Sequence, residues 1–567
     1  MNKRTLLCLK AYPPSLRASP RIQRLVLPAA PVLRRYLTTS TSPPKPDLVV
    51  VGSGIAGLSA SIEAAEKGAS VLLLERFHGG GTTALSGGVV YAGGGTQQQK
   101  DAGYDETPEN MLAYLRQEVS NAVDQKTLKR FCDQSVENLE WLEKHGARFE
   151  ASLCPYKTSY PTDRHFLYYS GSEKAYPFNQ HAKPAPRGHR MVHPGFSGAG
   201  LAQALLDTAK RLNVRLLPAS KVKKIILHDD GSVRGVKYRM LAETNSGFLR
   251  HKTLTQRALK YQLALPPLAA TLHKRANNIW EHNSQVESVE SPAVVLATGG
   301  FTFNPQMRNK HLPKFSGVAP LGTPADDGAG IKLGIAAGGS TSHMDRMSAW
   351  RFLYPPTALL EGVVVSQEGQ RIGAEDVYGA MLTEKMIRDF QSRGFLILDS
   401  TQWAKAKEQL WTQTASLVRL QRLHWLYWGH KKARSLEDLA RKFGISEQGL
   451  TKTVGAYNEA IQRGEPDSMN KTPDTRSAIL KPPFYGIDIS ATPTMGPQPV
   501  LGLTLGGLRV DGETGLVLNG SGEKIRGLYA AGRTAVGVCS DGYISGLSLA
   551  DGVFSGRRAG QHAVGSS

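Results

Sequence analysis

The segment 47–88, DLVVVGSGIAGLSASIEAAEKGASVLLLERFHGGGTTALSGG, constrains the fold of this chain more than any other part of the sequence. Two apolar runs, 48–51 and 71–74, flank a glycine turn and a stretch with helical periodicity. Short apolar runs bounded by turn residues are typical of buried strands in a parallel sheet. The order strand, glycine turn, helix and strand predicts an α/β fold with a Rossmann-like nucleotide-binding domain.

The glycine turn has the residues that a dinucleotide site needs. Gly52 permits a tight turn, Gly54 lets the backbone approach a pyrophosphate, and Gly57 lets the helix pack close to the sheet. The helix N-terminus then directs unpaired N–H groups and a partial positive charge at the phosphates. Glu75 ends the second apolar run, where its carboxylate can accept hydrogen bonds from a ribose diol. The alternative, a plain strand–helix–strand crossover with a glycine turn, leaves Glu75 unexplained.

A second loop rich in glycine and hydroxyl groups, RFHGGGTTALSGG at 76–88, follows the second strand directly. NAD-dependent domains usually continue into another helix at this point. The arrangement resembles the flavoproteins of the succinate dehydrogenase/fumarate reductase superfamily, in which such a loop runs under the flavin, and it implies FAD as the cofactor. Covalent-flavin members have a histidine after the glycines of this loop. Here His78 precedes the glycines, so we expect FAD to be held without a covalent bond.

The positive charge of the chain is concentrated at its N-terminus. The net charge is +21, but residues 1–46 hold nine Lys and Arg and no acid, which leaves 60 basic against 48 acidic residues, or +12. This segment ends in RRYLTTSTSPP and is typical of a mitochondrial transit peptide, with a processing site near Arg35 to Leu37. The alternative is a disordered basic tail on a cytoplasmic protein. We do not expect nucleic-acid binding, because the remaining charge is that of a solvated surface.

Length and composition exclude several other classes of protein. A chain of 567 residues is long enough for two domains with cores of their own. It has no run of about eighteen uncharged apolar residues, so no transmembrane helix is predicted. The four cysteines, Cys8, Cys132, Cys154 and Cys539, lack CxxC or CxxCH spacing, which argues against haem attachment, a zinc finger or a disulfide framework. We predict no metal site.

The remaining sequence predicts a chain that leaves and re-enters the FAD-binding domain. After the leader, 1–46, this domain takes 47–150, 196–335 and 496–567, with a polar and basic insertion at 240–290. The segment 151–195 is rich in Tyr, Pro, Gly and His and is predicted to form loops of a cap over the flavin. The segment 336–495 is predicted to form the rest of an inserted α+β domain that caps the substrate and carries catalytic residues.

The C-terminal segment 533–558 has the length and glycine pattern of the dicarboxylate-binding stretch in fumarate reductase and succinate dehydrogenase flavoproteins. In those proteins a histidine and an arginine bind the dicarboxylate. Alignment on Gly537 and Val538 places Cys539 at the histidine position and Tyr543 at the arginine position. A phenol cannot neutralise a carboxylate, but it can donate a hydrogen bond to a ketone. This difference favours a carbonyl substrate over fumarate.

Several stretches resemble the 3-ketosteroid dehydrogenases of the same superfamily, above all those of the Δ4-(5α) type. These stretches are SGGVVYAGGGT at 86–96, ETPENMLAYL at 106–115, FLYPPTALLEGVVVSQEGQR at 352–371 and GYISGLSLADGVFSGRRAG at 542–560. The similarity covers most of 47–560 apart from the insertion. One departure follows Arg371, where the family usually has an aromatic residue and then Val-Asn-Glu, whereas this chain has Ile-Gly-Ala before Glu375.

The resemblance implies an FAD-dependent oxidoreductase that desaturates a C–C bond beside a ketone in a steroid-like or polycyclic substrate, with an electron acceptor that the sequence leaves open. Such chemistry needs a group that polarises the carbonyl, a base for the α-proton, and flavin N5 to take the β-hydride. On the matching positions, Tyr543, Ser545 and Tyr354 are expected to form a hydrogen-bond relay, and Arg371 is a fourth catalytic candidate. Alternatively, Tyr354 packs in the core, Ser545 caps a helix, and Arg371 pairs with Glu375.

The predicted contacts of the cofactor come from all segments of the FAD-binding domain. They are Gly52, Ser53, Gly54, Gly57, Glu75, Arg76, Gly81, Thr82, Thr83, Ser86, Gly87, Gly88, Thr298, Gly299, Gly300, Asp327, Gly532, Arg533, Gly546, Ser548 and Leu549. Two other functions stay open at this point. One is reduction of an activated C=C bond in a small carboxylate, as in fumarate reductases, and the other is a flavoprotein with a binding or assembly role.

Overall fold

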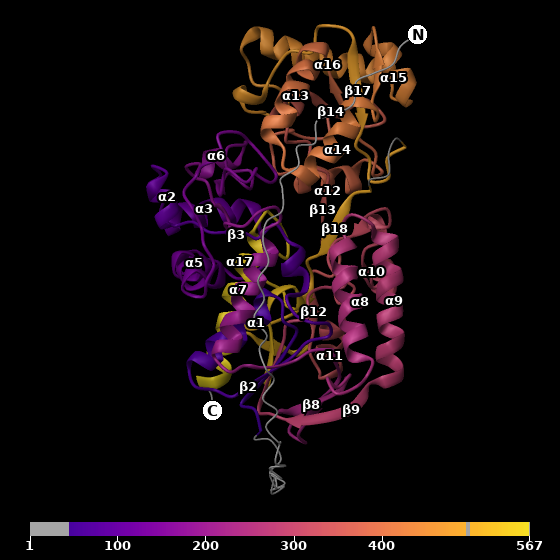
Figure 1. The fold of residues 1–567 in the computed structure, drawn as a ribbon. Helices are drawn as coiled ribbons and strands as arrows, with labels where there is room; N and C mark the ends of the chain where they lie inside the picture. The colour runs from indigo at the N-terminus through magenta and orange to yellow at the C-terminus, as the bar shows by residue number, and fades with distance from the viewer. Residues whose placement is uncertain (1–44, 495–498, 566–567) are drawn as a thin grey trace, which may run out of the picture. The chain divides into compact units, whose positions relative to one another are not determined.

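A computed structural model describes residues 45–494 and 499–565 of the chain. The chain divides into two units, 1–44 and 45–567, and the described residues all belong to the second unit. The predicted leader, 1–46, therefore lies almost entirely outside the described residues, and so does its predicted processing site near Arg35. Figure 1 shows the arrangement of the described helices and strands.

The nucleotide-binding region is built on a six-stranded sheet with the order β20-β21-β10-β1-β2-β6. Its strands are β1 (Leu48–Val51), β2 (Val71–Leu74), β6 (Arg215–Leu217), β10 (Ala293–Leu296), β20 (Leu516–Leu518) and β21 (Lys524–Ala530). All neighbours are parallel except β20 with β21. The predicted parallel strands at 48–51 and 71–74 are confirmed. Because β1 lies between β2 and β10, the glycine turn that follows β1 is placed at the centre of the sheet edge.

Helix α1 (Ile55–Glu66) packs along α17 (Leu547–Gly565). Three glycines at four-residue spacing, Gly552, Gly556 and Gly560, let the two backbones approach. A Cβ atom on Gly556 would lie 2.3 Å from the carbonyl oxygen of Ala56, and one on Gly560 would lie 2.4 Å from that of Ala60. This close contact fixes the start of α17, and with it the C-terminal motif, beside the glycine turn.

The predicted insertion at 240–290 is a helical hairpin between two strands of a second sheet. Strands β7 (Ser220–Leu227), β8 (Val233–Met240) and β9 (Gln285–Glu290) form an antiparallel meander. The hairpin consists of α8 (Phe248–Tyr261) and α9 (Pro266–Asn283), which lie side by side beyond β8 and β9 in Figure 1. The predicted insertion therefore included β9 in error, because this strand is mostly exposed and has the polar sequence QVESVE.

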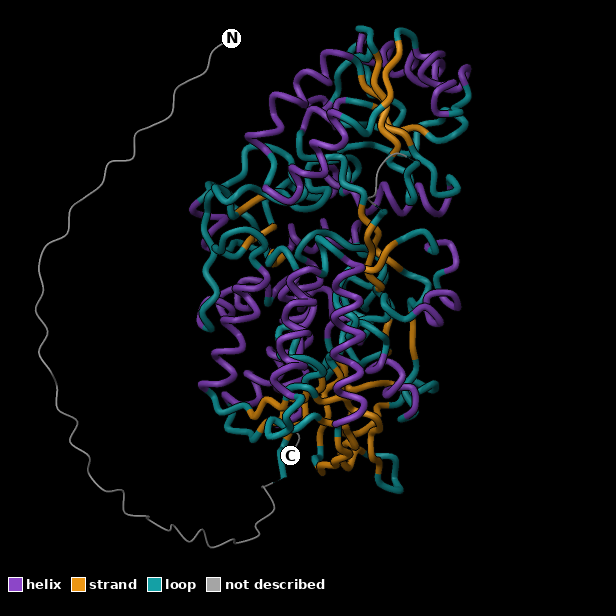
Figure 2. Tube along the Cα trace, turned by 45° about the vertical axis from the view of Figure 1, so that its right-hand side comes forward, coloured by secondary structure: helices purple, strands orange, loops and turns teal. Residues whose placement is uncertain are grey.

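The segment 336–495 contains a separate antiparallel sheet surrounded by helices, as predicted for an α+β unit. Its sheet has the order β14-β15-β17-β16, and Figure 2 shows these strands apart from those of the nucleotide-binding region. The strands are β14 (Val363–Val365), β15 (Phe395–Leu398), β16 (Lys431–Ala433) and β17 (Phe484–Asp488), with helices α12 (Gly379–Asp389), α13 (Ser400–Gln413), α14 (Ser416–Tyr427), α15 (Leu436–Phe443) and α16 (Glu447–Arg463).

A small sheet joins this capping segment to the nucleotide-binding region. Strand β18 (Leu501–Thr504) pairs antiparallel with β13 (Met347–Trp350) and parallel with β11 (Ala319–Pro320). Strand β13 runs into the stretch that contains Phe352 and Tyr354. The connection therefore brings one end of the capping segment to the loops that follow the parallel strands.

The segment 151–195, predicted as loops of the cap, contacts both regions. Its strands β4 (Leu167–Tyr168) and β5 (Gly188–Arg190) form a sheet with β3 (Val89–Tyr91), which belongs to the nucleotide-binding region. Towards the cap, the Ser159 hydroxyl donates to the carbonyl of Tyr354 at 3.0 Å. The prediction of a cap-only segment is therefore too simple, because the Tyr- and Pro-rich composition did not show that β5 would pair with β3.

The remaining described elements cover the sheets and connect them. They are α2 (Gln97–Asp101), α3 (Pro108–Glu118), α4 (Gln125–Asp133), α5 (Ser135–Lys144), α6 (Phe178–His181), α7 (Gly198–Arg211), α10 (Pro305–His311), α11 (Ala329–Ala336), β12 (Thr341–Ser342) and β19 (Gly507–Leu508), with 3₁₀ turns at Gly81–Leu85, Pro313–Phe315, Thr357–Glu361, Pro473–Thr475 and Gly532–Thr534. Thr107 caps α3, and Pro108 occupies its first turn.

Two absences hold within the described part of the chain. None of its helices combines the length and the apolar character needed to cross a bilayer. It also holds no cluster of His, Cys, Asp or Glu side chains that could bind a metal ion. The thiols of Cys132, Cys154 and Cys539 are free and buried.

The packing of α17 on α1 gives a prediction about stability. Gly556→Ala forces a Cβ atom against the α1 backbone, and we expect it to lower the free energy of unfolding by about 2 kcal/mol, as overpacking does. Gly455→Ala is the matched control, because a Cβ atom at Gly455 in α16 meets nothing within 4 Å. Removing this helical glycine should raise stability by about 1 kcal/mol. Chemical denaturation of both variants tests the sign, and equal effects would contradict the proposed contact.

Candidate functional site

The glycine turn after β1 is held in a conformation that leaves no room for side chains. Gly52 has a φ of +99°, and a Cβ atom there would lie 2.5 Å from the carbonyl oxygen of Ala297. A Cβ atom on Gly57 would lie 1.8 Å from the carbonyl oxygen of Gly52. Helix α1 begins at Ile55, so its N-terminus lies directly at this turn. The turn is therefore built as a cradle for an anionic group such as a pyrophosphate.

Glu75 lies at the end of β2 with its carboxylate next to this cradle. Its Oε2 accepts hydrogen bonds from the Ser53 backbone N–H at 3.0 Å and from the Ser53 hydroxyl at 2.6 Å. Its Oε1 accepts from the backbone N–H of Phe77 at 2.7 Å. A carboxylate has about four acceptor positions, so this one can accept further bonds from a ribose diol. Ser53 and Glu75 are thus brought together as the sequence predicted.

The second glycine loop meets two other segments of the FAD-binding region at Asp326. The Thr82 hydroxyl donates to Asp326 Oδ2 at 2.5 Å, and the Gly300 backbone N–H donates to Oδ1 at 3.1 Å. Arg533 Nη2 also donates to Oδ1, at 2.8 Å. The neighbouring Asp327, predicted from sequence as a cofactor contact, pairs with Arg76 at 2.7 Å. The sequence could not show which of the two acids faces the second glycine loop, because the direction of each side chain is set only in the folded structure.

Other predicted cofactor residues line or support the same loops. Ile55 N–H donates to the Thr83 hydroxyl at 2.9 Å, while the Ser86 hydroxyl donates to the Thr83 carbonyl at 2.7 Å. Thr298 Oγ1 accepts from the Gly330 N–H at 3.0 Å, and the Gly532 N–H donates to the Ser555 hydroxyl at 2.9 Å. Close backbone contacts explain the glycines at 88, 299 and 546, which have φ values of +64°, +80° and +93°. Leu549 is buried in α17.

The predicted catalytic side chains of the C-terminal motif lie in the turn that precedes α17. Tyr543 Oη is 3.3 Å from Ser548 Oγ, and Ser545 Oγ is 3.2 Å from Tyr168 Oη. Tyr354 Oη donates to the carbonyl of Val377 at 3.4 Å. In this structure each of the three hydroxyls of the expected relay therefore has a different partner. Tyr168 was missed because no sequence signal separates it from the other tyrosines of its segment.

Aromatic side chains from the capping segment surround Tyr543 and form what we call the aromatic cluster: Trp350, Phe352, Tyr354, Tyr378 and Tyr543. The Tyr543 ring centroid lies 5.4 Å from that of Trp350 and 6.4 Å from that of Tyr378. Phe352 joins them, at 5.4 Å from Tyr378 and 6.3 Å from Tyr354. The cluster thus connects the two predicted catalytic tyrosines through packed rings.

Burial keeps the phenols of this cluster in their neutral form. It raises the pKa of Tyr543 to about 12, and it raises the pKa of Tyr354 and Tyr378 as well. A phenol whose pKa lies above its ordinary value of about 10 is protonated at neutral pH. Tyr543 therefore acts as a hydrogen-bond donor in the physiological range, which is the role needed to polarise a carbonyl.

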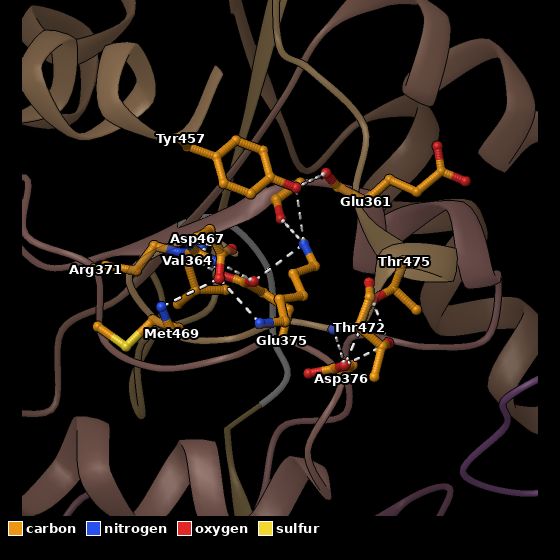
Figure 3. Close-up of polar contacts among 12 residues, drawn as sticks. Glu361, Val364, Arg371, Glu375, Asp376, Tyr457, Asp467, Met469, Thr472 and Thr475 are labelled. Atoms are coloured by element: carbon orange, nitrogen blue, oxygen red, sulfur yellow. Dashed lines mark hydrogen bonds and ion pairs between the residues drawn. The ribbon is translucent and has the colours of Figure 1, made fainter. Parts of the chain in front are cut away.

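Arg371 lies in a buried ion cluster of the capping segment (Figure 3). Its Nη2 is 2.6 Å from Glu375 Oε2, and its Nη1 is 3.2 Å from Asp467 Oδ2. Lys471 Nζ lies 3.1 Å from the same oxygen of Glu375. These contacts form the ion pair that the sequence offered as an alternative for Arg371 and Glu375. The structure does not bring Arg371 to the aromatic cluster, and its catalytic role stays a prediction.

Glu118 is a buried acid near the turn that the sequence analysis missed. The Tyr114 hydroxyl donates to Glu118 Oε1, and the Ser172 N–H donates to the Tyr114 hydroxyl at 2.8 Å. A Cβ atom on Gly542 would lie 1.8 Å from the Glu118 carbonyl oxygen, so the end of α3 abuts the residue before Tyr543. Burial raises the pKa of Glu118 to about 7. The spacing of Tyr114 and Glu118 by four residues on one helix face was the available signal.

The shifted pKa of Glu118 predicts that the free energy of unfolding depends on pH. Between about pH 4.5 and 7 the folded state binds a proton that the unfolded state releases, so stability falls as the pH rises through this window. Glu118→Gln removes this titration. The free energy of unfolding of the variant, relative to that of the unsubstituted protein, should therefore rise by about 3 kcal/mol as the pH increases through the window. Denaturant unfolding at pH 4.5 and 8 measures this change. Glu109→Gln, an exposed position on the same helix, is the control, and the same gain there would contradict the account.

The glycine cradle, the ribose carboxylate and the hydroxyl-rich loop together define an FAD-binding flavoprotein. Residues 47–545 match the family model described as FAD binding domain. The chain therefore belongs to this FAD-binding family of the fumarate reductase/succinate dehydrogenase superfamily and, within it, to the family of the 3-ketosteroid dehydrogenases. FAD is the cofactor, and the protein is an FAD-dependent oxidoreductase that acts on CH–CH groups.

Three comparisons support the family assignment. The 3-oxo-5-alpha-steroid 4-dehydrogenase of Comamonas testosteroni is 37% identical over 499 residues, which cover 86% of this chain and 92% of the relative. A fumarate reductase (cytochrome) of Shewanella frigidimarina is 26% identical and covers 91% of this chain and 77% of the relative. The 3-ketosteroid-Δ4-(5α)-dehydrogenase of Rhodococcus jostii RHA1, solved in complex with 4-androstene-3,17-dione, is 32% identical with a TM-score of 0.78, covering 93% and 98% of the two chains.

Proposed function

We propose that this chain introduces a C=C bond beside the ketone of a steroid-like or polycyclic substrate, using FAD held without a covalent bond. The observation that carries the proposal is the neutral phenol of Tyr543, which lies at the start of α17 among apolar rings. The names of the Comamonas and Rhodococcus dehydrogenases, 37% and 32% identical to this chain, support a ketosteroid as the substrate class.

The residues of this chain match the needs of such a reaction. The Tyr543 hydroxyl donates a hydrogen bond to the carbonyl oxygen and stabilises the negative charge that develops there when the α-proton leaves. Trp350 and Phe352 offer flat apolar faces against which a fused-ring skeleton can pack. The bound flavin supplies the acceptor for the β-hydride. Ser545 and Tyr168 form a second hydroxyl pair on the same turn, 3.2 Å apart, that can move a proton.

A small dicarboxylate is a poorer match to the same position. Carboxylate recognition uses guanidinium, ammonium or imidazolium groups, because these neutralise charge as well as donating hydrogen bonds. The ring of Tyr543 instead contacts Trp350 and Tyr378, and its hydroxyl contacts Ser548. The thiol of Cys539 is buried, and its pKa is raised by burial and by Asp551, so it cannot replace the histidine of the fumarate reductases.

Anaerobic absorbance of the purified flavoprotein tests this function. A saturated 3-ketosteroid should bleach the oxidised flavin, and Tyr543→Phe should slow this bleaching by about 100-fold, the usual cost of losing one such donor. The FAD content of the variant should stay unchanged, because the phenol hydroxyl lies outside the glycine cradle. Tyr427→Phe is the control, since Tyr427 is 45% exposed on α14.

Two results would overturn the proposal. One is reoxidation of the dye-reduced flavin by fumarate with no bleaching by the ketosteroid, which would support reduction of a small carboxylate. The other is a yellow protein that responds to neither compound, which would support a binding or assembly role.

We also propose that the basic leader directs the protein to mitochondria. The absence of acids from residues 1–46 and the nine Lys and Arg among them support this proposal. The full chain fused to a fluorescent protein at its C-terminus should overlap a mitochondrial marker, and a variant lacking residues 2–46 should lose the overlap. Unchanged localisation of the shortened chain would contradict the proposal.

A further inference from the structure

A cavity of about 270 Å³ lies between the inserted hairpin, α8 and α9, and the residues that follow Glu75. Its lining residues are Arg76, Phe77, Lys221, His251, His273, Lys274, Asn277, Trp280 and Pro324. Most of these belong to the hairpin, which lies within the segment predicted from sequence as an insertion. The cavity therefore gives the insertion a position next to the nucleotide-binding residues.

The cavity begins where the ribose site ends. The Phe77 backbone N–H donates to Glu75 Oε1 at 2.7 Å, so the ribose carboxylate and the cavity wall are directly connected. In a nucleotide the base is bonded to the ribose itself. A dinucleotide whose ribose diol bonds to Glu75 would therefore hold its adenine near the residues that follow Glu75, Arg76 and Phe77.

The hairpin is anchored firmly enough to act as a wall. The Trp280 indole N–H donates to the carbonyl of Ala219 at 2.7 Å, at the start of β7. His251 Nδ1 lies 3.1 Å from His78 Nε2, in the second glycine loop. The ring centroids of His273 and Phe77 are 5.4 Å apart. The base of the hairpin thus contacts both strands and loops that form the nucleotide site.

His273 has free hydrogen-bonding capacity at this wall. Both of its ring nitrogens are buried and have no hydrogen-bond partner among the described residues. Burial lowers the pKa of His273 to about 4, so the ring is neutral at pH 7 and has one N–H donor and one acceptor. Adenine presents the complementary pair, an N6 amino donor beside a ring-nitrogen acceptor.

Arg76 supplies a second feature suited to a purine. Its Nη1 pairs with Asp327 Oδ2 at 2.7 Å and donates to the carbonyl of Pro324 at 3.2 Å. These contacts fix the guanidinium plane at the edge of the cavity. A planar guanidinium held in this way can stack on an aromatic base.

We propose that the inserted hairpin forms one wall of the adenosine site of this protein, with His273 hydrogen-bonding the adenine edge. The ligand class is an adenine nucleotide, here the adenosine half of FAD. The inference concerns cofactor binding alone and stands independently of the ketone substrate.

Dissociation constants measured after removal of the bound flavin test this inference. His273→Ala should weaken binding of FAD by about tenfold, the effect of losing one or two hydrogen bonds to the base. Binding of ADP, measured through its competition with FAD, should weaken by a similar factor. Binding of FMN, which lacks adenosine, should stay the same. His273→Gln keeps a donor and an acceptor and should retain most of the FAD affinity.

His282→Ala is the matched control, because His282 is an exposed histidine on the same helix. It should leave the FAD constant unchanged. An unaltered FAD constant in folded His273→Ala would overturn the inference, and so would an equal weakening of FMN, which would indicate a general disturbance of the fold. Thermal unfolding of the flavin-free variants shows whether each variant is folded. If His273→Ala does not fold, a tenfold weakening of FAD binding in His273→Gln overturns the inference instead.

Discussion

The contact between α1 and α17 is the interaction on which the site depends. Because Gly552, Gly556 and Gly560 have no side chains, the last helix of the chain can lie against the first helix of the nucleotide-binding region. Arg557 strengthens the contact through Glu63, at 2.8 Å. The turn that holds Tyr543 is thereby carried to the glycine cradle at Gly52, although the two are separated by almost the whole sequence. A larger residue on this face of α17 would move the turn that holds Tyr543 away from the glycine cradle.

A second constraint is the connection between the nucleotide-binding region and the capping segment. Strand β13 pairs with β18 and leads directly into Phe352 and Tyr354, so the aromatic cluster is formed by residues from two regions. Tyr543 comes from one side and Trp350, Phe352 and Tyr378 from the other. The buried ion cluster around Arg371 and Glu375 lies inside the capping segment and holds its loops together.

The sequence predicted the fold and the cofactor well because their signals are local. A glycine turn between two apolar runs with an acid at the end of the second run, Glu75, leaves few alternatives. The contacts of Asp326 with Arg533 and of Tyr168 with Ser545 could not be predicted, because they join side chains 207 and 377 residues apart. The segment 240–290 was predicted as a polar surface insertion. Its role against the adenosine site follows only from the folded position of His273 and Arg76.

The most direct test of the account is the rate of flavin reduction by a saturated cyclic ketone that has deuterium at the carbon β to its carbonyl. The account predicts slower anaerobic bleaching than with the unlabelled ketone, together with a conjugated enone as the product, because the β C–H bond breaks as the flavin is reduced. Equal rates for the two ketones would show that this bond does not limit reduction. Failure of both ketones to reduce the flavin, with rapid reoxidation of the reduced protein by fumarate, would contradict the account.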